Sequence, residues 1–190
     1  LHVLGERPLS RGVCIVFLGI GCPVSNELLP ELNRLSTVAA GESVEFFGVV
    51  SDQHSALGEL IELRDKYDVR FPLLFDANGE LAERLGPRTT PEAFLHDAHG
   101  SLLYRGRIDD RSGLKRIGDN QPKERDLLGA MEALGQGRPL QVRQTGPIGC
   151  AFENWPEPEA LELSWLRHIP PILQANCVDC HCDGGAAPFS

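Results

Sequence analysis

The sequence predicts an α/β sandwich in which helices flank a central mixed β-sheet. Short apolar runs, rich in β-branched and aromatic residues, alternate along the chain with segments whose apolar residues recur at helical spacing. The connections between these segments are short, which is typical of one compact domain with strands and crossover helices. At 190 residues the chain is long enough to bury a proper core and to carry an appendage.

The composition is that of an ordinary globular protein, with 42% hydrophobic and 24% charged residues. A net charge of −9 argues against nucleic acid or an anionic membrane surface as the main partner. No apolar stretch approaches the roughly 20 residues that are needed to span a bilayer. No secretory leader pattern opens the chain. It begins at Leu1 rather than at a methionine, so we expect a processed or excised piece.

The clearest strand-to-helix signal lies near the N-terminus. Val13–Leu18 is an unbroken apolar run that is too short for a helix, so it predicts a buried strand. Gly19 and Gly21 break this run. A helix is expected beyond them, because apolar residues recur there at helical spacing: Leu28, Leu29, Leu32 and Leu35.

The remaining elements follow from the same two periodicities. Further strands are expected at 44–50, 71–75, 93–95 and 102–104, and further helices at 56–67, 80–85 and 123–134. His96–Gly100 is expected to form a hairpin connection, because turn-forming residues there separate two apolar runs. We therefore expect one compact domain over 1–146, a linker over 147–163 and a further segment over 164–190.

A cysteine stands where the first helix is expected to begin, in the motif Cys22-Pro23-Val24-Ser25. Free N–H groups and the positive end of the helix dipole stabilise a thiolate there, so we expect a lowered pKa for Cys22. Pro23 suits the first helical position, because its fixed φ is helical and its missing N–H costs nothing there. Ser25 is a candidate hydrogen-bond donor to the sulfur. The motif predicts a reactive thiolate, and a cysteine kept only for packing is the alternative.

Two blocks of the sequence resemble a known family. The residues GIGCPVSNELLPELNRL and TTPEAFLHDAHGSLLYRGRIDDR are similar to the redoxin group of the alkyl hydroperoxide reductase/thiol-specific antioxidant superfamily. This resemblance implies a thioredoxin-like sandwich and a cis peptide bond before Pro91, packed beside the active cysteine. It also implies thiol-based or peroxidase-like redox activity at Cys22, with Thr90 and Pro91 shaping the substrate groove.

The sequence departs from this family at two positions. Ser25 stands where a thioredoxin CxxC motif has its second cysteine, so Cys22 is the only thiol of the motif. Gly19 stands where the peroxiredoxin signature has a threonine that helps to orient the peroxide. The first departure excludes a cysteine pair within the motif, and the second argues against peroxide reduction.

Two other cysteines have different expected roles. Cys14 lies inside the first predicted strand and is expected to be a buried, unreactive thiol. Cys150 lies beyond the last predicted helix and could fold back to resolve an oxidised Cys22. The same two thiols could instead bind a soft metal such as copper. A free or structurally paired thiol on a connecting loop is the remaining alternative for Cys150.

The C-terminal segment carries a haem-attachment pattern. Beyond a stretch rich in proline and glutamate, Cys177-Val178-Asp179-Cys180-His181 has the CxxCH spacing of c-type cytochromes. In that chemistry the two thiols add to the haem vinyl groups and the histidine ligates the iron. IPPILQANCVDCH followed by APFS also resembles the haem segment of bacterial multidomain c-type cytochromes joined to redoxin domains. We therefore expect covalent haem c on Cys177 and Cys180, with His181 as the metal ligand.

Other interpretations of this segment stay open. Cys177, Cys180, His181 and Cys182 could form a zinc or copper site, although three consecutive ligands are sterically awkward. The segment could also bind neither haem nor metal. Only nine residues follow His181, so 164–190 is expected to be the start of a small helical haem-attachment domain that has been cut off.

These features predict a periplasmic or otherwise extracytoplasmic thiol oxidoreductase, because c-type haem is attached outside the cytoplasm. Cys22 would exchange electrons with a small-molecule or protein thiol/disulfide substrate, and the C-terminal haem would pass them to or from an electron-transfer partner. Two other functions are considered. One is a non-catalytic redoxin scaffold that binds copper or a partner protein through Cys22 and Cys150, and the other is a structural spacer in an electron-transfer chain.

Overall fold

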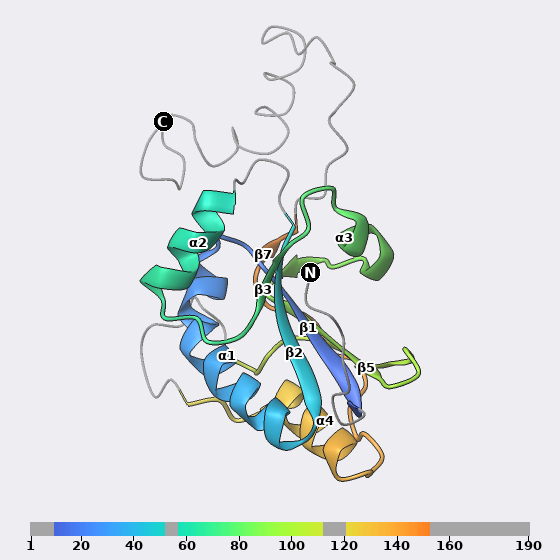
Figure 1. Ribbon diagram of the computed structural model, residues 1–190. Helices are drawn as coiled ribbons and strands as arrows, with labels where there is room; N and C mark the ends of the chain where they lie inside the picture. Colours follow the sequence, from blue (N-terminus) through green and yellow to red (C-terminus); the bar gives the residue numbers. More distant parts are fainter. Residues whose placement is uncertain (1–9, 52–56, 112–120, 153–190) are drawn as a thin grey trace, which may run out of the picture. The chain divides into compact units, whose positions relative to one another are not determined.

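The computed structural model describes residues 10–51, 57–111 and 121–152, and Figure 1 shows how their elements are arranged. The chain divides into two compact units, 1–154 and 155–190, and every described residue belongs to the first. Within the described residues, we find no helix with the length and apolar character that crossing a membrane requires.

A five-stranded mixed sheet forms the centre of this unit. In spatial order its strands are β3 (Leu73–Phe75), β2 (Val44–Val50), β1 (Gly12–Leu18), β5 (Glu92–Asp97) and β6 (Leu102–Gly106). Strands β1, β2 and β3 are parallel, β5 is antiparallel to β1, and β6 is antiparallel to β5. Cys14 of β1 lies between Phe46 of β2 and Leu95 of β5, at the middle of the sheet. This is the thioredoxin-like α/β fold that the family resemblance implies.

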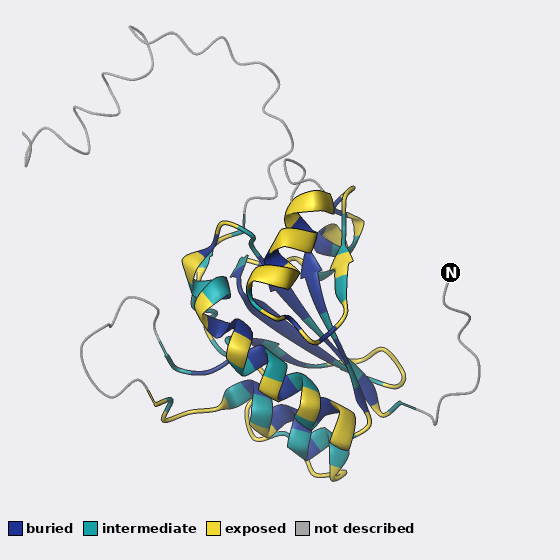
Figure 2. Ribbon diagram, turned by 60° about the vertical axis from the view of Figure 1, so that its left-hand side comes forward, coloured by how far each residue is buried: buried dark blue, intermediate teal, exposed yellow. Residues whose placement is uncertain are grey.

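Helices cover both faces of the sheet. The helices α1 (Pro23–Gly41), α2 (Leu57–Lys66) and α4 (Asp126–Gly135) contribute to the larger of two hydrophobic clusters. The short helix α3 (Glu80–Leu85) contributes to a second cluster, with β-strand residues that point the other way. Figure 2 shows that the helices bury the sides that face the sheet and expose their outer sides. The alternation of buried residues along β1 and β2 thus separates two cores.

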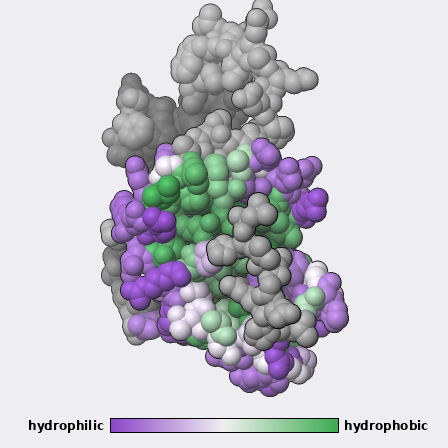
Figure 3. Space-filling view, in the orientation of Figure 1, coloured by the Kyte–Doolittle hydropathy of each residue, from purple (hydrophilic) through white to green (hydrophobic). Residues whose placement is uncertain are grey.

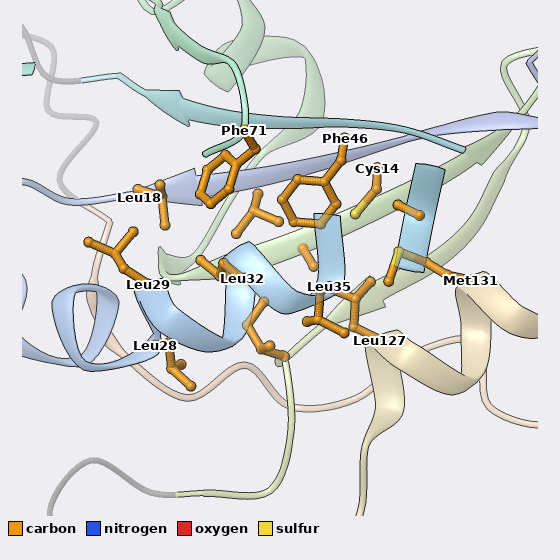
Figure 4. Packing of buried hydrophobic residues seen from close by; sticks show 14 of the residues in the cluster. Cys14, Leu18, Leu28, Leu29, Leu32, Leu35, Phe46, Phe71, Leu127 and Met131 are labelled. Carbon is orange, nitrogen blue, oxygen red and sulfur yellow. The ribbon is translucent and has the colours of Figure 1, made fainter. Parts of the chain in front are cut away.

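Helix α1 supplies much of the larger core. Its leucines at the predicted apolar positions are all buried: Leu28, Leu29, Leu32 and Leu35. Figure 4 shows the α1 leucines close to Leu18 and Cys14 of β1 and Phe46 of β2, with Leu127 and Met131 of α4 beside them. Burying one leucine contributes roughly 1.5–3 kcal/mol, so this face holds α1, and the residue at its start, firmly against the sheet.

Large apolar side chains are exposed mainly on α2 and β3. Leu57 and Ile61 of α2 are 58% and 44% exposed, and Leu74 of β3 is 44% exposed. Figure 3 shows apolar residues gathered on the face of the molecule that carries these two elements. This apolar surface is therefore formed by α2 and the edge strand β3. Cys22 belongs to another element, since it lies at the start of α1.

Most predicted elements have the expected positions, with small differences at their ends. Strands β1 and β2 and helix α3 span almost the predicted ranges, and α3 ends at Gly86 with φ 60°. Strand β3 begins at Leu73 rather than at 71, because Pro72 before it has no N–H to give to the ladder. Helix α4 begins at Asp126 rather than at 123, because Arg125 has a non-helical backbone with φ −113° and ψ 66°.

The structure also contains a two-stranded sheet that the sequence pattern does not predict. Strand β4 (Thr89–Thr90) pairs antiparallel with β7 (Cys150–Ala151). The sequence pattern assigns 147–163 to a linker, but β7 lies within the first compact unit and is hydrogen-bonded to it. Two-residue strands carry no periodicity of their own, so composition alone suggests a linker here.

Candidate active site

Cys22 begins helix α1 as its N-cap residue. Its backbone is extended, with φ −83° and ψ 113°, and its Sγ accepts a hydrogen bond from the Ser25 N–H at 3.4 Å. Pro23 follows at the start of the helix, where its lack of an N–H leaves no hydrogen bond unmade. A sulfur at this position faces free N–H groups and the positive end of the helix dipole, and both favour a thiolate.

Two side chains of α1 hold the turn between β1 and the helix. Ser25 is buried, and its Oγ accepts a hydrogen bond from the Gly19 N–H at 3.3 Å. Asn26 Nδ2 donates a hydrogen bond to the Ile20 carbonyl oxygen at 3.1 Å. Ser25 therefore fixes the turn while its own N–H contacts the Cys22 sulfur. Asn26 is not among the predicted site residues, because an asparagine in the first turn of a helix is common and carries no distinctive signal.

The loop before β5 lies against Cys22. The Thr90–Pro91 peptide bond is cis, as the family resemblance implies. The Cys22 thiol donates a hydrogen bond to the Thr90 carbonyl oxygen, with a sulfur-to-oxygen distance of 3.0 Å. Thr90 is buried and follows Cys22 by 68 residues, so the fold of the whole sheet creates this contact.

Cys150 reaches Cys22 from the C-terminal side of the domain. In the β4–β7 pair, Cys150 lies directly opposite Thr90. The Sγ atoms of Cys150 and Cys22 are 2.9 Å apart, and both thiols are free. Sulfur atoms in a disulfide are about 2.05 Å apart, so a shift of less than an ångström would bring this pair to bonding distance. The structure thus brings together Cys22 and Cys150, one of the pairings that the sequence leaves open.

The two sulfur atoms of this pair differ in acidity. Burial raises the pKa of Cys22, but hydrogen bonds with the side chains of Cys150, Ser25 and Thr90 and with the Ser25 N–H outweigh this effect and lower its pKa to about 7. The hydrogen bond with Cys22, followed by burial, raises the pKa of Cys150. Near neutral pH the pair therefore holds its thiolate on Cys22, with the Cys150 S–H as a hydrogen-bond donor to it.

Gly19 lies between Cys22 and Thr90, at the position where the peroxiredoxin signature has a threonine. A Cβ on residue 19 would lie 2.8 Å from Thr90 Oγ1 and 3.0 Å from Cys22 Cβ. Atoms at these distances repel each other, so a larger residue would have to displace the Thr90 loop or the cysteine. The site is built around a glycine, and this backbone leaves no room for a threonine side chain.

A buried ion pair fixes the segment that carries β4. Glu92 is fully buried, and its carboxylate accepts hydrogen bonds from the Arg88 N–H and from the guanidinium groups of Arg88 and Arg105. Burial raises the pKa of Glu92, but these hydrogen bonds outweigh it and lower the pKa. The Arg88 carbonyl in turn accepts the Phe152 N–H at 2.9 Å, next to β7. Glu92 has no distinctive signal in the sequence, because one charged residue before an apolar run is usually a solvated strand end.

The sulfur atoms of Cys22 and Cys150, 2.9 Å apart, leave no space for a metal ion between them as they stand. The described part of the chain contains no group of three or more His, Cys, Asp or Glu side chains that could hold one. Metal–sulfur bonds are about 2.3 Å long, so sulfur atoms as close as these would have to separate before an ion could lie between them. Copper binding by Cys22 and Cys150 stays a prediction from the sequence.

The predicted haem and zinc ligands lie outside the residues that the structure describes. These residues are Cys177, Cys180, His181 and Cys182. Both expectations for this segment therefore stay predictions from the sequence.

Comparison with characterised proteins identifies two curated relatives. The chain is 27% identical over 95 residues to the thiol-disulfide oxidoreductase ResA of Bacillus thuringiensis subsp. konkukian, and equally to that of Bacillus cereus. The aligned region covers 50% of this chain and 53% of each relative. The chain thus spans about half the length of the curated relatives that it matches.

Two solved structures share most of the fold. An uncharacterized conserved protein from Geobacillus kaustophilus is 25% identical, with a TM-score of 0.69, over 78% of this chain and 80% of that one. A hypothetical protein from Sinorhizobium meliloti 1021 is 25% identical, with a TM-score of 0.67, over 75% of this chain and 79% of that one.

The model of one protein family matches the part of the chain that holds most of the site. Residues 8–105, just over half of the chain, match the AhpC/TSA family. The match includes Cys22, Ser25, Thr90 and Pro91, whereas Cys150 lies beyond it. The chain therefore belongs to the AhpC/TSA family.

Proposed function

We propose that this domain is a thiol-disulfide oxidoreductase whose redox pair is Cys22 and Cys150. The observation that carries the proposal is the 2.9 Å distance between their sulfur atoms. Membership of the AhpC/TSA family and the similarity to ResA, a thiol-disulfide oxidoreductase, support the reaction class. In a CxxC motif the second cysteine would stand at the position of Ser25. In this proposal Cys150 of β7 takes its role.

The reaction moves two electrons between the cysteine pair and a substrate disulfide. The Cys22 thiolate attacks one substrate sulfur, which breaks the substrate disulfide and releases its other sulfur as a thiolate. Cys150 then loses its proton, attacks the Cys22 sulfur of the mixed disulfide and releases the second substrate thiolate. The pair is left as a disulfide, and a dithiol reductant returns it to the thiol form. The reverse sequence oxidises a substrate dithiol.

The difference in acidity assigns the two roles. An attacking thiol works best when its pKa is near the ambient pH, and a pKa of about 7 gives Cys22 that property. Cys150, whose pKa is raised, stays protonated until the mixed disulfide has formed. Ser25 and the start of α1 stabilise the Cys22 thiolate, and the Thr90 carbonyl, before the cis bond to Pro91, lies beside the Cys22 sulfur.

Disulfide exchange is better supported than peroxide reduction. Peroxide reduction in the family that the sequence resembles uses a threonine at the position of Gly19, and the backbone here has no room for its side chain. Disulfide exchange needs only two sulfur atoms that can approach in turn, and the Cys22–Cys150 pair meets that requirement.

The proposal is tested by mapping the disulfides of the full chain after equilibration with mixtures of reduced and oxidised glutathione. We expect a peptide in which Cys22 is joined to Cys150, formed and lost reversibly as the glutathione ratio changes. A Cys14→Ala variant is the matched control, since it removes a thiol outside the pair. Turnover of a disulfide substrate with dithiothreitol as the reductant completes the test. A Cys22 that stays reduced at every ratio, or pairs only with a C-terminal cysteine, would contradict the proposal.

We further propose that the C-terminal segment attaches haem c through Cys177 and Cys180, with His181 as iron ligand, in an extracytoplasmic compartment. This proposal is supported by the CxxCH motif alone. When bound, the haem would supply a one-electron redox centre. Co-expression with a cytochrome c maturation system, followed by a pyridine haemochrome spectrum, tests it. Covalent haem in the native chain and none in a Cys177→Ala/Cys180→Ala variant is the expected result, and a haem-free native chain would contradict it.

A further inference from the structure

Residues Gly149–Phe152, hereafter the strap, run beside β4 and bring Cys150 against Cys22. Cys150 and Ala151 of the strap pair with Thr90 and Thr89 of β4, and Cys22 is only 5% exposed. Cys150 Sγ is 2.9 Å from Cys22 Sγ and so takes up the place that a reacting substrate sulfur needs. An external disulfide can therefore reach Cys22 only when the strap has moved.

Thr145, hereafter the root of the strap, precedes it in the chain and is held by three contacts with β6 and the residue after it. The Thr145 N–H donates a hydrogen bond to the Arg105 carbonyl oxygen at 3.1 Å. Its Oγ1 accepts the Arg107 N–H at 3.0 Å and is 2.9 Å from the Tyr104 hydroxyl. Residues 146–148 then connect this root to the strap. The strap can therefore leave β4 while the root keeps Cys150 close to the site.

The contacts along the strap define a short pattern of residue types. Gly149 lies so close to the Thr90 carbonyl that a Cβ on it would overlap the oxygen atom. The ring of Phe152 packs edge-on against Phe17, with ring centroids 5.8 Å apart. Ala151, which stands between Cys150 and Phe152 in the sequence, is exposed. The contacts of the strap therefore require a glycine, a cysteine, a residue of any type and an aromatic residue, in that order.

We propose that the strap occupies, within the same chain, the binding site of an extended polypeptide substrate. This inference rests on the proposed function, because it names the substrate class of the same cysteine pair. A substrate segment adds to β4 as an antiparallel strand through main-chain hydrogen bonds, in place of the strap. Its reactive cysteine then lies where Cys150 lies, with glycine before it and an aromatic residue two positions after it.

Strand exchange and disulfide exchange proceed together in this arrangement. The substrate strand displaces the strap, and the Cys22 thiolate attacks the substrate cysteine sulfur while the other substrate sulfur leaves as a thiolate. When the strap returns to β4, deprotonated Cys150 attacks the Cys22 sulfur and releases the substrate strand as a thiolate. The proton lost by Cys150 goes to solvent, and a dithiol reductant restores the pair.

The first test measures how fast iodoacetamide labels Cys22 in the reduced full-length protein. Phe152→Ala removes the aromatic contact of the strap, and we expect labelling of Cys22 to accelerate roughly fivefold to tenfold, as the loss of one such contact implies. Gly149→Ala forces the strap away from Thr90, and we expect at least as large an acceleration. Val142→Ala, at an exposed position before the root, is the matched control and leaves the rate unchanged.

Labelling of Cys14 in the same samples separates strap opening from general unfolding. Cys14 is fully buried in the sheet, so we expect it to stay unlabelled in every variant. Equal rates at Cys22 in the native, Phe152→Ala and Gly149→Ala proteins would overturn the proposal. Cys14 labelling in step with Cys22 would also overturn it, because the sheet and not the strap would then be opening.

The second test uses the peptide Pro-Ile-Gly-Cys-Ala-Phe, which copies residues 147–152, activated as a mixed disulfide with thionitrobenzoate. In a Cys150→Ser protein we expect this peptide to trap on Cys22 several-fold faster than peptides with the glycine or the phenylalanine changed to alanine. Oxidised glutathione, which has no strand to add, provides the small-molecule arm. No preference among the peptides would overturn the strap proposal, as would native protein that reacts through Cys150 while Cys22 stays free.

The two proposals fail in distinguishable ways. If the Cys22–Cys150 disulfide does not form in glutathione mixtures, the proposed redox pair is wrong whatever the strap does. If the disulfide forms normally while the strap variants and the peptides have no effect, only the inference about the polypeptide substrate is wrong.

Discussion

Two buried cysteines of the domain, Cys14 and Cys22, have opposite chemistry although they belong to adjacent parts of the chain. Cys14 is 0% exposed at the middle of β1, and Cys22 is 5% exposed at the start of α1. Burial alone raises the pKa of Cys14 far above its ordinary value. Burial also raises the pKa of Cys22, but hydrogen bonds lower it to about 7.

The difference shows that exposure does not decide which of these thiols is reactive. Around Cys14 the neighbours are apolar side chains of two strands and a helix, which offer a thiolate no hydrogen bond. Around Cys22 the neighbours are the Ser25 N–H and the Cys150 thiol, which stabilise a negative sulfur. The same low-polarity interior that suppresses one thiol therefore strengthens the hydrogen bonds that activate the other.

Removing each thiol in turn gives the largest contrast. We expect Cys22→Ser to lower the rate of disulfide exchange by roughly a thousandfold or more, as the loss of a covalent nucleophile does. Cys14→Ala should leave that rate within about twofold but lower the free energy of unfolding by about 1–2 kcal/mol, because it leaves a small cavity. Turnover of a disulfide substrate checks the exchange rates, and urea denaturation checks the free energy of unfolding. A Cys14→Ala protein that folds normally and loses turnover would break the comparison.

Removing the partner sulfur has the next largest effect. Cys150→Ala deletes the hydrogen bond that contributes most to lowering the pKa of Cys22. We therefore expect the pH midpoint for ionisation of Cys22 to rise toward the ordinary thiol value of about 8.5. Multiple turnover should also stop at the mixed disulfide, which mass spectrometry would detect on Cys22. An unchanged midpoint would mean that the helix start alone activates the thiol.

Removing the serine hydroxyl has the smallest effect of the three. Ser25→Ala deletes one side-chain hydrogen bond to Cys22 and leaves the backbone N–H in place. The midpoint should rise by less than in Cys150→Ala, and turnover at neutral pH should fall only severalfold. Ser36→Ala, on the same helix with its hydroxyl bonded to the Asn33 carbonyl, is the matched control. Equal midpoints in the two serine variants would mean that the Ser25 hydroxyl does not stabilise the Cys22 thiolate.

The contrast between Cys14 and Cys22 could be predicted from sequence, because local pattern carries it. An apolar run of strand length places Cys14 inside a sheet, and a glycine turn followed by Cys-Pro places Cys22 at a helix start. The same holds for the cis bond before Pro91, which follows from the family resemblance and is present in the structure. These features depend on a few consecutive residues or on a short motif.

The position of Cys150 could not be derived in the same way. It follows Cys22 by 128 residues and reaches it through a two-residue ladder with Thr90, for which no periodic signal exists. Gly149 before it lacks a side chain because the Thr90 carbonyl fills that space, a requirement that only the folded chain reveals. For the same reason the sequence pattern assigns this stretch to a linker, whereas the structure pairs it with the main domain.

A pH titration of the reduced full-length protein, followed by the ultraviolet absorbance of the thiolate, tests the central claim most directly. Cys22→Ser protein serves as the blank, so that the difference reports Cys22. We expect a midpoint near the pKa of about 7 that hydrogen bonds from the side chains of Cys150, Ser25 and Thr90 and from the Ser25 N–H produce. A midpoint at or above about 8.5, the value of an ordinary thiol, would contradict it, because burial would then outweigh every hydrogen bond to the sulfur.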